Sequence, residues 1–483
     1  MKYYLGIDLG TSSIKVSVAN SDGKIIDSES RDYPLLLPKV NWSEQNPDDW
    51  FEALVKVLSE LNKRIDLKQV ASLSFSGQMH GLVILDENDN VIRPAILWND
   101  SRTVDEVEYL NKVIGLKTLI EETGNIALCG FTAPKVLWLY NNEKANFVKI
   151  AKIMLPKDYL AYKLSGIFAS DISDLSGTLF FDVKKADYSD KMLEILHIKR
   201  EQLPKIYNSY EVIGTVTPEI SQLTNLSTET KVVIGGGDQA VGATGTNTLE
   251  AGTISISLGT SGVVFAPTKE YYYDSIGRIH SFRHTTGKYH LMGCTLSAMG
   301  SLKWFLEEIL NTNDFTKELD SMPDDINDVI FLPYLMGERS PINDPQAKGC
   351  FSNLSLFYKR NDLIKAVVEG ICFSLFDVYS VMKDDGIVAQ SARVIGGGTK
   401  NDKLMQILAD IFGIPMKTIT TSDGGALGAI ILAMVGDGKY EDVASASSHL
   451  VYDNRIFEPN SEKHEFYLKK FGKNKDLYSK TRS

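Results

Sequence analysis

Cysteine is scarce in this sequence, and its pattern excludes several kinds of site. The chain has four cysteines in 483 residues, with no CxxC pair and no histidine at zinc-ligand spacing. They are Cys129, Cys294, Cys350 and Cys372. We therefore expect reduced thiols in a cytoplasmic protein.

Long hydrophobic runs are also lacking. No stretch approaches the roughly 18 unbroken apolar residues of a membrane span. Asp8 and Lys15 interrupt the apolar start MKYYLGIDLG too early for a signal peptide. We expect no membrane partner.

The chain has no excess of positive charge. It contains 51 lysines and arginines against 62 aspartates and glutamates, which gives a formal net charge of -11. Proteins that bind a nucleic-acid backbone usually carry a basic surface, so nucleic acid is not the expected partner. If the protein handles phosphate, it should use local backbone donors or a metal ion.

Length and composition are those of a multidomain globular protein. Single hydrophobic cores stop growing at about 250 to 300 residues, and this chain is longer. Its hydrophobic content of 43% and charged content of 23% are ordinary for a packed fold. We expect two or three domains.

Strand and helix patterns alternate near the start of the chain. The segments YYLGID, IKVSVA and IIDSES are typical of three strands joined by tight turns, a β-meander. Pro47 stands at the start of NPDDWFEALVKVLSELNKR, where apolar residues recur at helical spacing. The strand VASLSFS follows, so the pattern predicts a mixed α/β sheet.

A weak internal repeat links residues 4–19 with residues 254–266. YLGIDLGTSSIKVSVA and ISISLGTSGVVFA both indicate a strand, an LGTS turn and a second strand. We predict a duplicated architecture with an N-terminal domain of residues 1–245 and a C-terminal domain of residues 246–483. Because no flexible linker separates them, we expect the halves to meet across a rigid cleft.

The two LGTS turns are candidates for phosphate binding. The chain has no GxxxxGK[ST] loop and no GxGxxG fingerprint after a strand. Each LGTS turn offers closely spaced N–H groups and hydroxyls, and two such turns facing each other would clamp a polyphosphate. The alternative is that Gly10 and Gly259 simply make hairpin turns.

Asp8 is a candidate for the metal side of such a site. It lies at the end of an apolar strand, where an unpaired charge is costly. A Mg²⁺ ion, held directly or through its water shell, would compensate the charge with one or two protein carboxylates. The alternative is a side chain that caps its own turn.

Two glycine clusters follow predicted strands. In RVIGGGTKNDKLMQILADIFG, Asn401 begins an amphipathic helix, and Gly396 to Gly398 suit an adenine or ribose site or a plain strand-to-helix turn. In KVVIGGGDQAVGATG, Asp238 and Gln239 follow three glycines where the two halves join. An acid exposed at a strand end in an α/β enzyme is a catalytic candidate.

His80, in SFSGQMHGLVIL, is one of only seven histidines. It is open to four interpretations: a metal ligand, a general base, a core residue or a substrate contact. No second histidine or cysteine stands at ligand spacing nearby, which weakens the first interpretation.

Taken together, the motifs resemble the FGGY carbohydrate kinases, and within that family the xylulokinases. The resemblance spans nearly the whole chain and is carried, in order, by GIDLGTSSIKV, NWSEQNPDDW, GQMHG, RPAILWNDSRT, GFTAPKVLWL, LPKDYLAYKLSG, DISDLSGT, GGGDQA, SLGTSGV, FLPYLMGERSP, IGGGTKND and GALGAI. It implies two actin-like α/β domains of ribonuclease-H-type topology, with mixed sheets flanked by helices and ATP in the cleft. The implied reaction is ATP-dependent phosphorylation of D-xylulose to D-xylulose 5-phosphate.

The resemblance also implies residue roles. Asp238 corresponds to the general base, Asp8 to the carboxylate near Mg²⁺, and Met79 and His80 to sugar contacts. Gln239, also expected at the sugar, stands where some xylulokinases have Asn. The expected ATP contacts are Thr11 and Ser12 in the first turn, Gly259, Thr260 and Ser261 in the second turn, and Gly397, Gly398 and Asn401 on the nucleoside side.

Two charged pairs and one tryptophan remain open. Trp98, with Asp100 and Arg102, would line a polyol pocket, although a core Trp and an ion pair are the more ordinary interpretations. Glu338 and Arg339 resemble a family loop near the active site, and a solvated pair is the alternative. DISDLSG caps a helix or turn and is assigned no chemistry.

Other functions remain as alternatives. The acceptor could be another pentulose, a pentitol or a sugar acid. An ATP-driven chaperone-like protein would need a substrate module that the chain lacks, and a non-catalytic sugar-binding protein would not need Asp8 and Asp238. The resemblance favours a homodimer.

Overall fold

The N-terminal part of the chain forms a large mixed β-sheet in the computed structural model, which describes residues 2–420 and 423–481. Its strand order is β13 (Val212–Thr215), β14 (Lys231–Val233), β5 (Val70–Gly77), β1 (Tyr3–Leu9), β2 (Ser13–Ala19) and β3 (Ile25–Asp32), and β15 (Gly236–Gly237) also pairs with β5. β1 to β3 are antiparallel, whereas β5 runs parallel to β1 and β14. The predicted meander and the strand before the GQMHG motif are confirmed.

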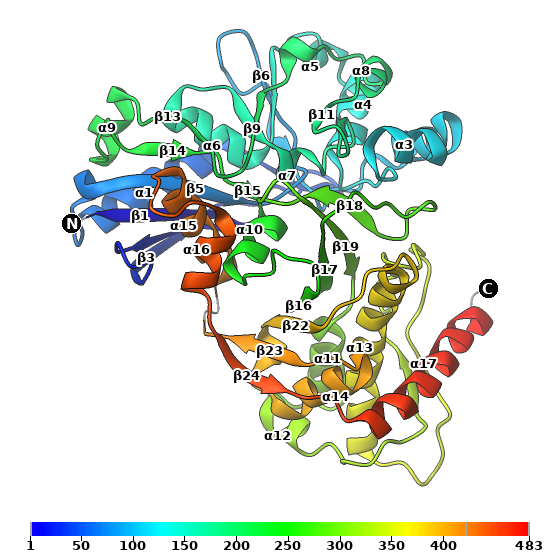
Figure 1. Ribbon diagram of the computed structural model, residues 1–483. Helices are drawn as coiled ribbons and strands as arrows, with labels where there is room; N and C mark the ends of the chain where they lie inside the picture. Colours follow the sequence, from blue (N-terminus) through cyan, green and yellow to red (C-terminus); the bar gives the residue numbers. More distant parts are fainter. Residues whose placement is uncertain (1, 421–422, 482–483) are drawn as a thin grey trace.

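The C-terminal part builds a second sheet with the same pattern. Its order is β18 (His280–Arg283), β19 (Tyr289–Thr295), β17 (Gly262–Thr268), β16 (Thr253–Leu258), β22 (Ser391–Gly396), β23 (Met416–Ile419) and β24 (Asp453–Phe457). Antiparallel β19, β17 and β16 match β3, β2 and β1, and parallel β22 and β23 match β5 and β14. The two LGTS turns join equivalent strand pairs. The repeat seen in the sequence is therefore a structural duplication, and the two-domain α/β fold is confirmed (Figure 1).

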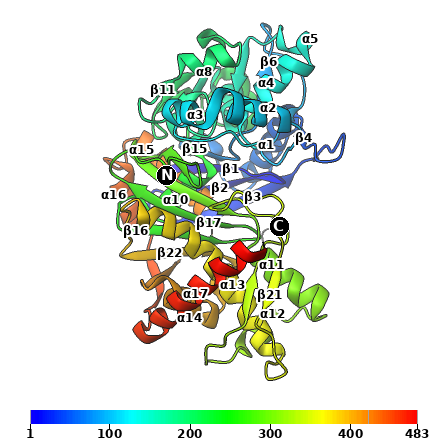
Figure 2. The ribbon, with the colours of Figure 1, turned by 90° about the vertical axis from the view of Figure 1, so that its right-hand side faces the viewer.

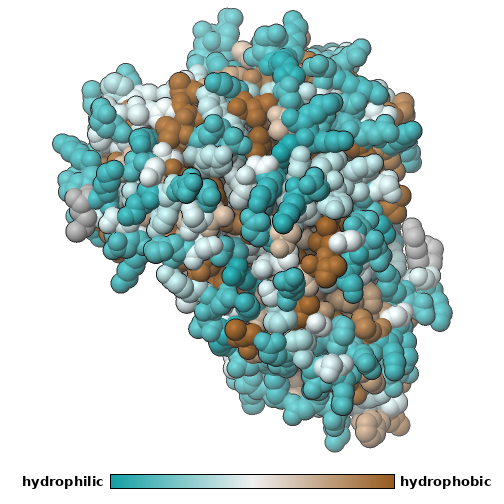
Figure 3. All heavy atoms as spheres, in the orientation of Figure 1, coloured by the Kyte–Doolittle hydropathy of each residue, from teal (hydrophilic) through white to brown (hydrophobic). Residues whose placement is uncertain are grey.

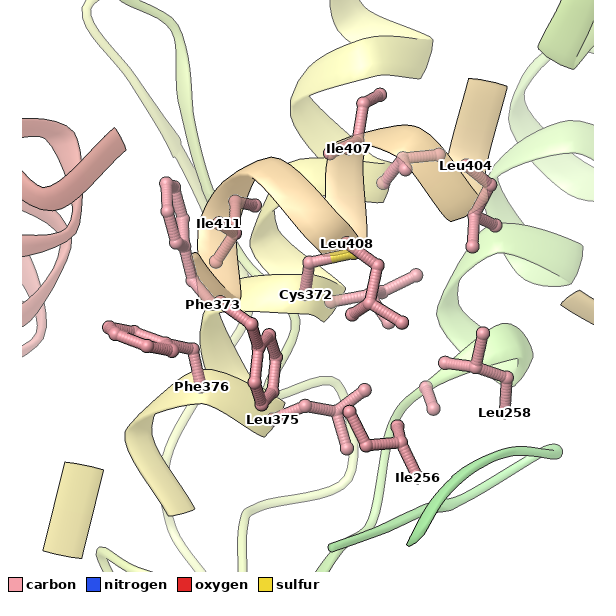
Figure 4. Close-up of a cluster of buried hydrophobic side chains, with 14 of the residues drawn as sticks. Ile256, Leu258, Cys372, Phe373, Leu375, Phe376, Leu404, Ile407, Leu408 and Ile411 are labelled. Atoms are coloured by element: carbon pink, nitrogen blue, oxygen red, sulfur yellow. The ribbon is translucent and has the colours of Figure 1, made fainter. Parts of the chain in front are cut away.

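Helices form where apolar spacing and capping residues agree. α1 (Pro47–Asn62) starts with Pro47 in its first turn and with the Asn46 side chain accepting the N–H of Asp48. In the second half, α13 (Arg360–Asp384) and α14 (Asp402–Phe412) pack together against the second sheet. Figure 4 shows Cys372 and Phe376 of α13 in this core with Leu408 of α14.

Two helices hold the halves of the chain together. α10 (Asp238–Gly245) crosses α15 (Gly424–Gly436), and α15 also packs on β1 and β5 of the first sheet. The crossing is close because a Cβ on Gly245 would lie 1.9 Å from the Gly424 carbonyl oxygen, and a Cβ on Gly428 would lie 2.0 Å from that of Val241. Residues late in the sequence thus return to the first sheet (Figure 1).

A lobe of short elements lies at the top of the molecule in Figure 2. Its core includes Phe131, Trp138, Leu175 and Phe181. Its helices are α2 (Val104–Glu108), α3 (Leu116–Thr123), α4 (Thr132–Asn142), α5 (Lys144–Phe147), α7 (Ile172–Leu175) and α8 (Asp190–Ile195), whereas α6 (Pro156–Ser165) packs on the first sheet. Its paired short strands are β4 (Glu44–Gln45) with β7 (Ala95–Ile96), β6 (Val83–Leu85) with β8 (Lys152–Met154), β9 (Ala169–Asp171) with β12 (Lys205–Tyr207), and β10 (Phe181–Asp182) with β11 (Asp187–Tyr188).

The remaining elements flank the two sheets. They are α9 (Pro218–Thr224), α11 (Met299–Trp304), α12 (Phe315–Asp320), α16 (Val443–Leu450), α17 (Ser461–Thr481) and the hairpin of β20 (Ile330–Leu332) and β21 (Cys350–Ser352). The face shown in Figure 3 is mostly hydrophilic with scattered apolar patches. Within residues 2–420 and 423–481, none of the helices has both the length and the apolar character that crossing a membrane requires.

Candidate active site

Asp238 lies where the first sheet meets the helix crossing. It is the first residue of α10 and directly follows β15, whose Gly237 is in register with Gly77 at the end of β5. The Gly237 N–H donates to Ser173 Oγ at 3.2 Å, so the backbone before Asp238 is held in place. The side chain faces the space between the two sheets.

Asp8 shares a cavity with Asp238. The cavity has a volume of about 260 Å³ and takes walls from both halves of the chain. Its lining includes Asp8, Gly10, Ser76, Asp238 and Gln239 from the first half, and Ser255, Ser257, Phe265, Gly424 and Gly425 from the second. The structure therefore brings together the two carboxylates that the sequence singled out.

The charged forms of these two carboxyl groups are both disfavoured. Burial raises the pKa of Asp8 to about 6, and the nearby Asp423 adds to the rise. Burial and the charge of Asp8 together raise the pKa of Asp238 to about 7. Two acids that oppose each other's ionisation in one cavity favour a bound cation or a shared proton.

The residues suit a magnesium ion held by few protein ligands. No group of three or more histidine, cysteine, aspartate or glutamate side chains in the described part of the chain forms a ready metal cage. Mg²⁺ commonly takes one or two carboxylates and completes its shell with water and phosphate oxygens. Asp8 in a cavity lined by glycines and serines fits that requirement.

The first LGTS turn is held in place by side chains that donate hydrogen bonds to its oxygen atoms. The Tyr33 hydroxyl donates to the Gly10 carbonyl, and Gln45 Nε2 donates to the Thr11 carbonyl at 2.7 Å. Trp98 Nε1 donates to Thr11 Oγ1 at 2.9 Å. These bonds hold the backbone of the turn in place beside the cavity that Gly10 lines.

The second LGTS turn is fixed by the start of α11. The N–H groups of Ala298 and Gly300 donate to the Thr260 carbonyl, and that of Met299 donates to the Gly259 carbonyl, each at 3.0 Å. Beyond this turn lies a cavity of about 620 Å³ that includes Thr260, Gly300 and Trp304. Trp304 was not singled out by the sequence, and only its place four residues after Gly300 on one helix would have suggested it.

A third cavity, of about 210 Å³, lies on the other side of Asp238. All five residues expected at the sugar line this cavity. The lining is Met79, His80, Trp98, Phe131, Asp238, Gln239, Ser261, Val263, His280, Met292, Cys294, Thr295, Leu296 and Arg339. Asp238 and Gln239 are common to this cavity and to the one that contains Asp8.

His80 is held in an unusual backbone conformation. Its φ is 69°, and its carbonyl oxygen accepts hydrogen bonds from Lys135 Nζ at 2.8 Å and Thr132 Oγ1 at 3.2 Å. Its Nδ1 lies 2.8 Å from the Gly177 carbonyl oxygen, so Nδ1 carries the proton. Burial lowers the pKa of His80 well below its usual value, which keeps the ring neutral.

Some residues left open by the sequence do not reach these cavities. Asp100 and Arg102 form a buried ion pair at 2.7 Å, and Arg102 also pairs with Glu44 and lies over the Trp42 ring. The ion-pair interpretation of Asp100 and Arg102 is thus the one that the structure bears out. Their place is structural support for the strand end that carries Trp98.

The solvated-pair interpretation of Glu338 and Arg339 is wrong. Glu338 is 2% exposed and accepts the backbone N–H groups of Leu296 at 2.5 Å and Arg339 at 2.8 Å. Burial raises its pKa to about 7. These bonds hold the Arg339 backbone at the 210 Å³ cavity, which the Arg339 side chain lines.

The nucleoside-side candidates lie outside the three cavities. Asn401 caps α14 by accepting the Leu404 N–H at 3.0 Å, and its amide donates to Asp320. Gly398 lies against Leu258, next to the second LGTS turn, and a Cβ on Gly397 would meet nothing within 4 Å. The triple glycine therefore forms a strand-to-helix turn beside the second LGTS turn.

The comparisons with known proteins agree with this geometry. The model of the FGGY family of carbohydrate kinases matches residues 3–245 with its N-terminal domain and residues 254–436 with its C-terminal domain. A xylulose kinase from Escherichia coli (strain K12) is 40% identical over 436 residues, which cover 89% of this chain and 90% of the relative.

Solved structures have the same fold over nearly the whole chain. A crystal structure described as a xyloylose kinase from Brucella ovis superposes with a TM-score of 0.94 at 32% identity, covering 99% of both chains. A gluconate kinase from Lactobacillus acidophilus superposes with a TM-score of 0.95 at 28% identity, covering 99% of this chain and 98% of the other. The protein therefore belongs to the FGGY family of carbohydrate kinases.

Proposed function

We propose that this carbohydrate kinase transfers the γ-phosphoryl group of ATP to the O5 hydroxyl of D-xylulose, giving D-xylulose 5-phosphate and ADP. Membership of the family makes it an ATP-using phosphotransferase. The choice of sugar is supported by the E. coli relative, a xylulose kinase at 40% identity.

The observation that carries the proposal is the position of Asp238 between two cavities. One cavity contains Asp8 and the glycines of the interdomain cleft, and the other contains Met79 and His80. Phosphoryl transfer requires the attacking hydroxyl and the phosphate to meet in line, with the proton acceptor beside the hydroxyl. A carboxylate in the wall between a phosphate site and a sugar site meets that requirement.

Asp238 would orient the sugar hydroxyl and accept its proton as the attack develops. Its pKa near 7 makes it a stronger base than an ordinary aspartate while leaving much of it ionised at neutral pH. Asp8 would hold Mg²⁺, directly or through water, and the ion would supply charge neutralisation at the phosphates. Closure of the two domains would exclude water, the competing acceptor.

The remaining residues divide between the two substrates. Met79, His80, Gln239 and Trp98 would contact the sugar, and Trp98 would also tie the sugar side to the first phosphate turn through its bond to Thr11. The phosphates would meet Thr11, Ser12, Gly259, Thr260 and Ser261. The nucleoside would lie near Gly397, Gly398 and Asn401, with Trp304 offering an aromatic face for the base.

Further organisation follows from the same proposal. We assign residues 1–245 to sugar binding, the first phosphate turn and catalysis, and residues 246–483 to the second turn and the nucleoside. The free cysteines agree with a reducing compartment such as the cytoplasm. A homodimer is the proposed assembly.

A sugar-acid kinase is the second candidate. Arg339 places a guanidinium in the sugar cavity, where it would pair with a carboxylate, and one structural relative is a gluconate kinase. An ADP-release assay over ketopentoses, aldopentoses, pentitols, glycerol and gluconate separates the two. Preference for D-xylulose by kcat/KM supports the first candidate, and preference for gluconate replaces it with the second.

The activity should depend on pH through Asp238. We expect kcat/KM for the sugar to rise with pH and to level off above a midpoint near 7, because the protonated acid cannot accept the hydroxyl proton. Because Asp8 and Asp238 interact, the pH profile reports the titration of both acids together, and its rising part extends down towards pH 6. Steady-state rates from pH 5.5 to 9 at saturating Mg²⁺ and ATP measure this. A flat profile over pH 5.5 to 8 would contradict it.

A further inference from the structure

A second histidine lines the proposed sugar cavity together with His80. His280 is the first residue of β18, is 3% exposed, and shares the cavity with His80 and Arg339. The Phe131 ring separates the two histidines, with ring centroids 4.7 Å from His80 and 5.4 Å from His280. The two imidazoles thus approach the same space from different elements.

The proton on His280 is fixed by Asn125. The Asn125 amide nitrogen donates to the carbonyl oxygens of Ser281 at 2.9 Å and Thr123 at 3.2 Å. Its side-chain oxygen accepts the Ser281 N–H at 3.2 Å. Because the backbone of Ser281 supplies both a donor and an acceptor, the Asn125 amide has only one satisfactory orientation.

That orientation decides the tautomer of His280. Its Nδ1 lies 3.3 Å from the Asn125 side-chain oxygen, which can only accept, so Nδ1 must carry the proton. Burial and the Arg339 charge lower the pKa of His280 to about 3, so the ring is neutral. The other nitrogen, Nε2, is then an acceptor.

Nε2 of His280 is open to the cavity. The described residues give it no hydrogen-bond partner, and it is not among the fully buried side-chain atoms that lack one. His290, a neighbouring buried histidine, differs because both of its ring nitrogens are buried without a partner. His280 therefore presents an unused acceptor where His290 presents none.

We propose that His280 is a second sugar-binding histidine, whose Nε2 accepts a hydrogen bond from a hydroxyl of the acceptor sugar other than the one phosphorylated. This inference rests on the proposed function and names the chemistry that the sugar site selects. His80 has the same Nδ1–H state through the Gly177 carbonyl oxygen. The two histidines and Asp238 thus offer acceptors to hydroxyl groups of the sugar, and Arg339 offers a donor for a carbonyl or hydroxyl oxygen. Asn125 is the positioning residue that keeps His280 an acceptor.

The test measures kcat/KM of the wild type and of His280 variants, each with D-xylulose and with its monodeoxy analogues. We expect His280→Phe to lower kcat/KM for D-xylulose about 10- to 100-fold, with the KM for ATP unchanged. For one monodeoxy analogue of D-xylulose, wild type and variant should have equal kcat/KM, because the partner hydroxyl is already missing. His280→Gln, whose amide oxygen can replace Nε2 as an acceptor, should lose less. His290→Phe, the matched control, should retain wild-type kinetics with every sugar.

Two kinetic results would overturn the inference. One is an unchanged kcat/KM in His280→Phe, and the other is the same loss with D-xylulose and all its deoxy analogues. Nitrogen-15 NMR of the imidazoles in the wild-type protein is an independent readout, and a charged or Nε2–H His280 would also contradict the assignment. If the wild type prefers another sugar, the proposed function fails at that step, and the same comparison is made with that sugar and its deoxy analogues.

Discussion

Asp238→Asn is expected to lower kcat about 10³- to 10⁴-fold while sugar and ATP affinities change little. The amide keeps the size and a hydrogen-bond acceptor of the side chain but cannot take up the hydroxyl proton. The carboxylate stands in the wall shared by the two substrate cavities, so no other acid in those walls has the same access to both. Stopped-flow or coupled assays measure kcat, and calorimetric titration with D-xylulose measures binding.

Stability provides the control that the variant is folded. Asp238 has a pKa of about 7 in the native protein against an ordinary value of 3.8, so its ionisation opposes folding. The cost grows as pH rises from about 4 to 7 and is constant above that. Asp238→Asn should therefore unfold at a higher temperature than the wild type at pH 8, and the difference should shrink towards pH 4.

Glu338→Gln tests whether the loss of kcat in Asp238→Asn comes from lost proton transfer or from neutralising a buried acid. The pKa of Glu338 is likewise raised to about 7 by burial, but its oxygens accept backbone N–H groups of Leu296 and Arg339. We expect a smaller loss than in Asp238→Asn, seen mainly in the sugar KM, because the Arg339 side chain would shift.

A wild-type kcat in Asp238→Asn would show that Asp238 is not the general base.

Local patterns in the sequence predicted local structure well. The meander of β1 to β3, helix α1 with Pro47 in its first turn, and helix α14 with Asn401 as its cap all depend on neighbours within a few residues. The repeated LGTS turns also predicted the duplication, because similar sequences at corresponding places in the two halves form corresponding pairs of antiparallel strands. These features need no long-range information.

The helix crossing could not be predicted in the same way. The small-residue run after Asp238 and the GALGAI segment are separated by about 180 residues, and neither shows that Gly245 lies against Gly424 or Gly428 against Val241. Small residues are compatible with many close contacts. Only the folded chain shows that α15 packs on the first sheet.

In the candidate site, the sequence found the acids and missed part of the sugar cavity. Asp8, Asp238, Met79 and His80 stand in recognisable motifs beside predicted strand ends. His280 stands in RIHSFRH, where alternation indicates a strand but gives no sign of which histidine faces a cavity. The place of Glu338 stayed open because a charged pair in a loop is usually solvated, whereas here backbone N–H groups compensate its burial.

The segments LPKDY and DISDLSG, which have no chemistry assigned to them, meet behind Asp238. Lys157, whose side chain is fully buried, lies 2.6 Å from Asp158 and 3.0 Å from Asp171. Asp171 also accepts bonds from the Ser173 N–H and hydroxyl, and Ser173 Oγ accepts the Gly237 N–H. A buried charge is thus connected through two side chains to Gly237, the residue before the proposed general base Asp238.

Lys157→Met is therefore expected to destabilise the protein by about 3 to 5 kcal/mol, the cost of leaving a buried carboxylate without its partner. The neighbouring acids raise the pKa of Lys157 above its usual value. Its contribution is accordingly complete below pH 10.5, the ordinary lysine value, and the loss should be equal at pH 6 and pH 9. Urea unfolding at the two pH values measures it. Lys157→Met/Asp171→Asn should recover part of the loss, because it removes one of the two acids that lose their partner.

Lys135→Met is the matched control, since Lys135 is equally buried but bonds only carbonyl oxygens, those of His80 and Gly130. Burial lowers its pKa from 10.5 to about 7, so charging it opposes folding increasingly as pH falls from 10.5 to 7. The loss in Lys135→Met should therefore be smaller at pH 6 than at pH 9, unlike that in Lys157→Met. An equal pH dependence in the two variants, or a stable Lys157→Met, would show that the Lys157 cluster does not anchor the backbone before Asp238. If the cluster does anchor it, Asp238, the proposed general base, is positioned by an ion pair whose residues line neither of the two cavities that Asp238 shares.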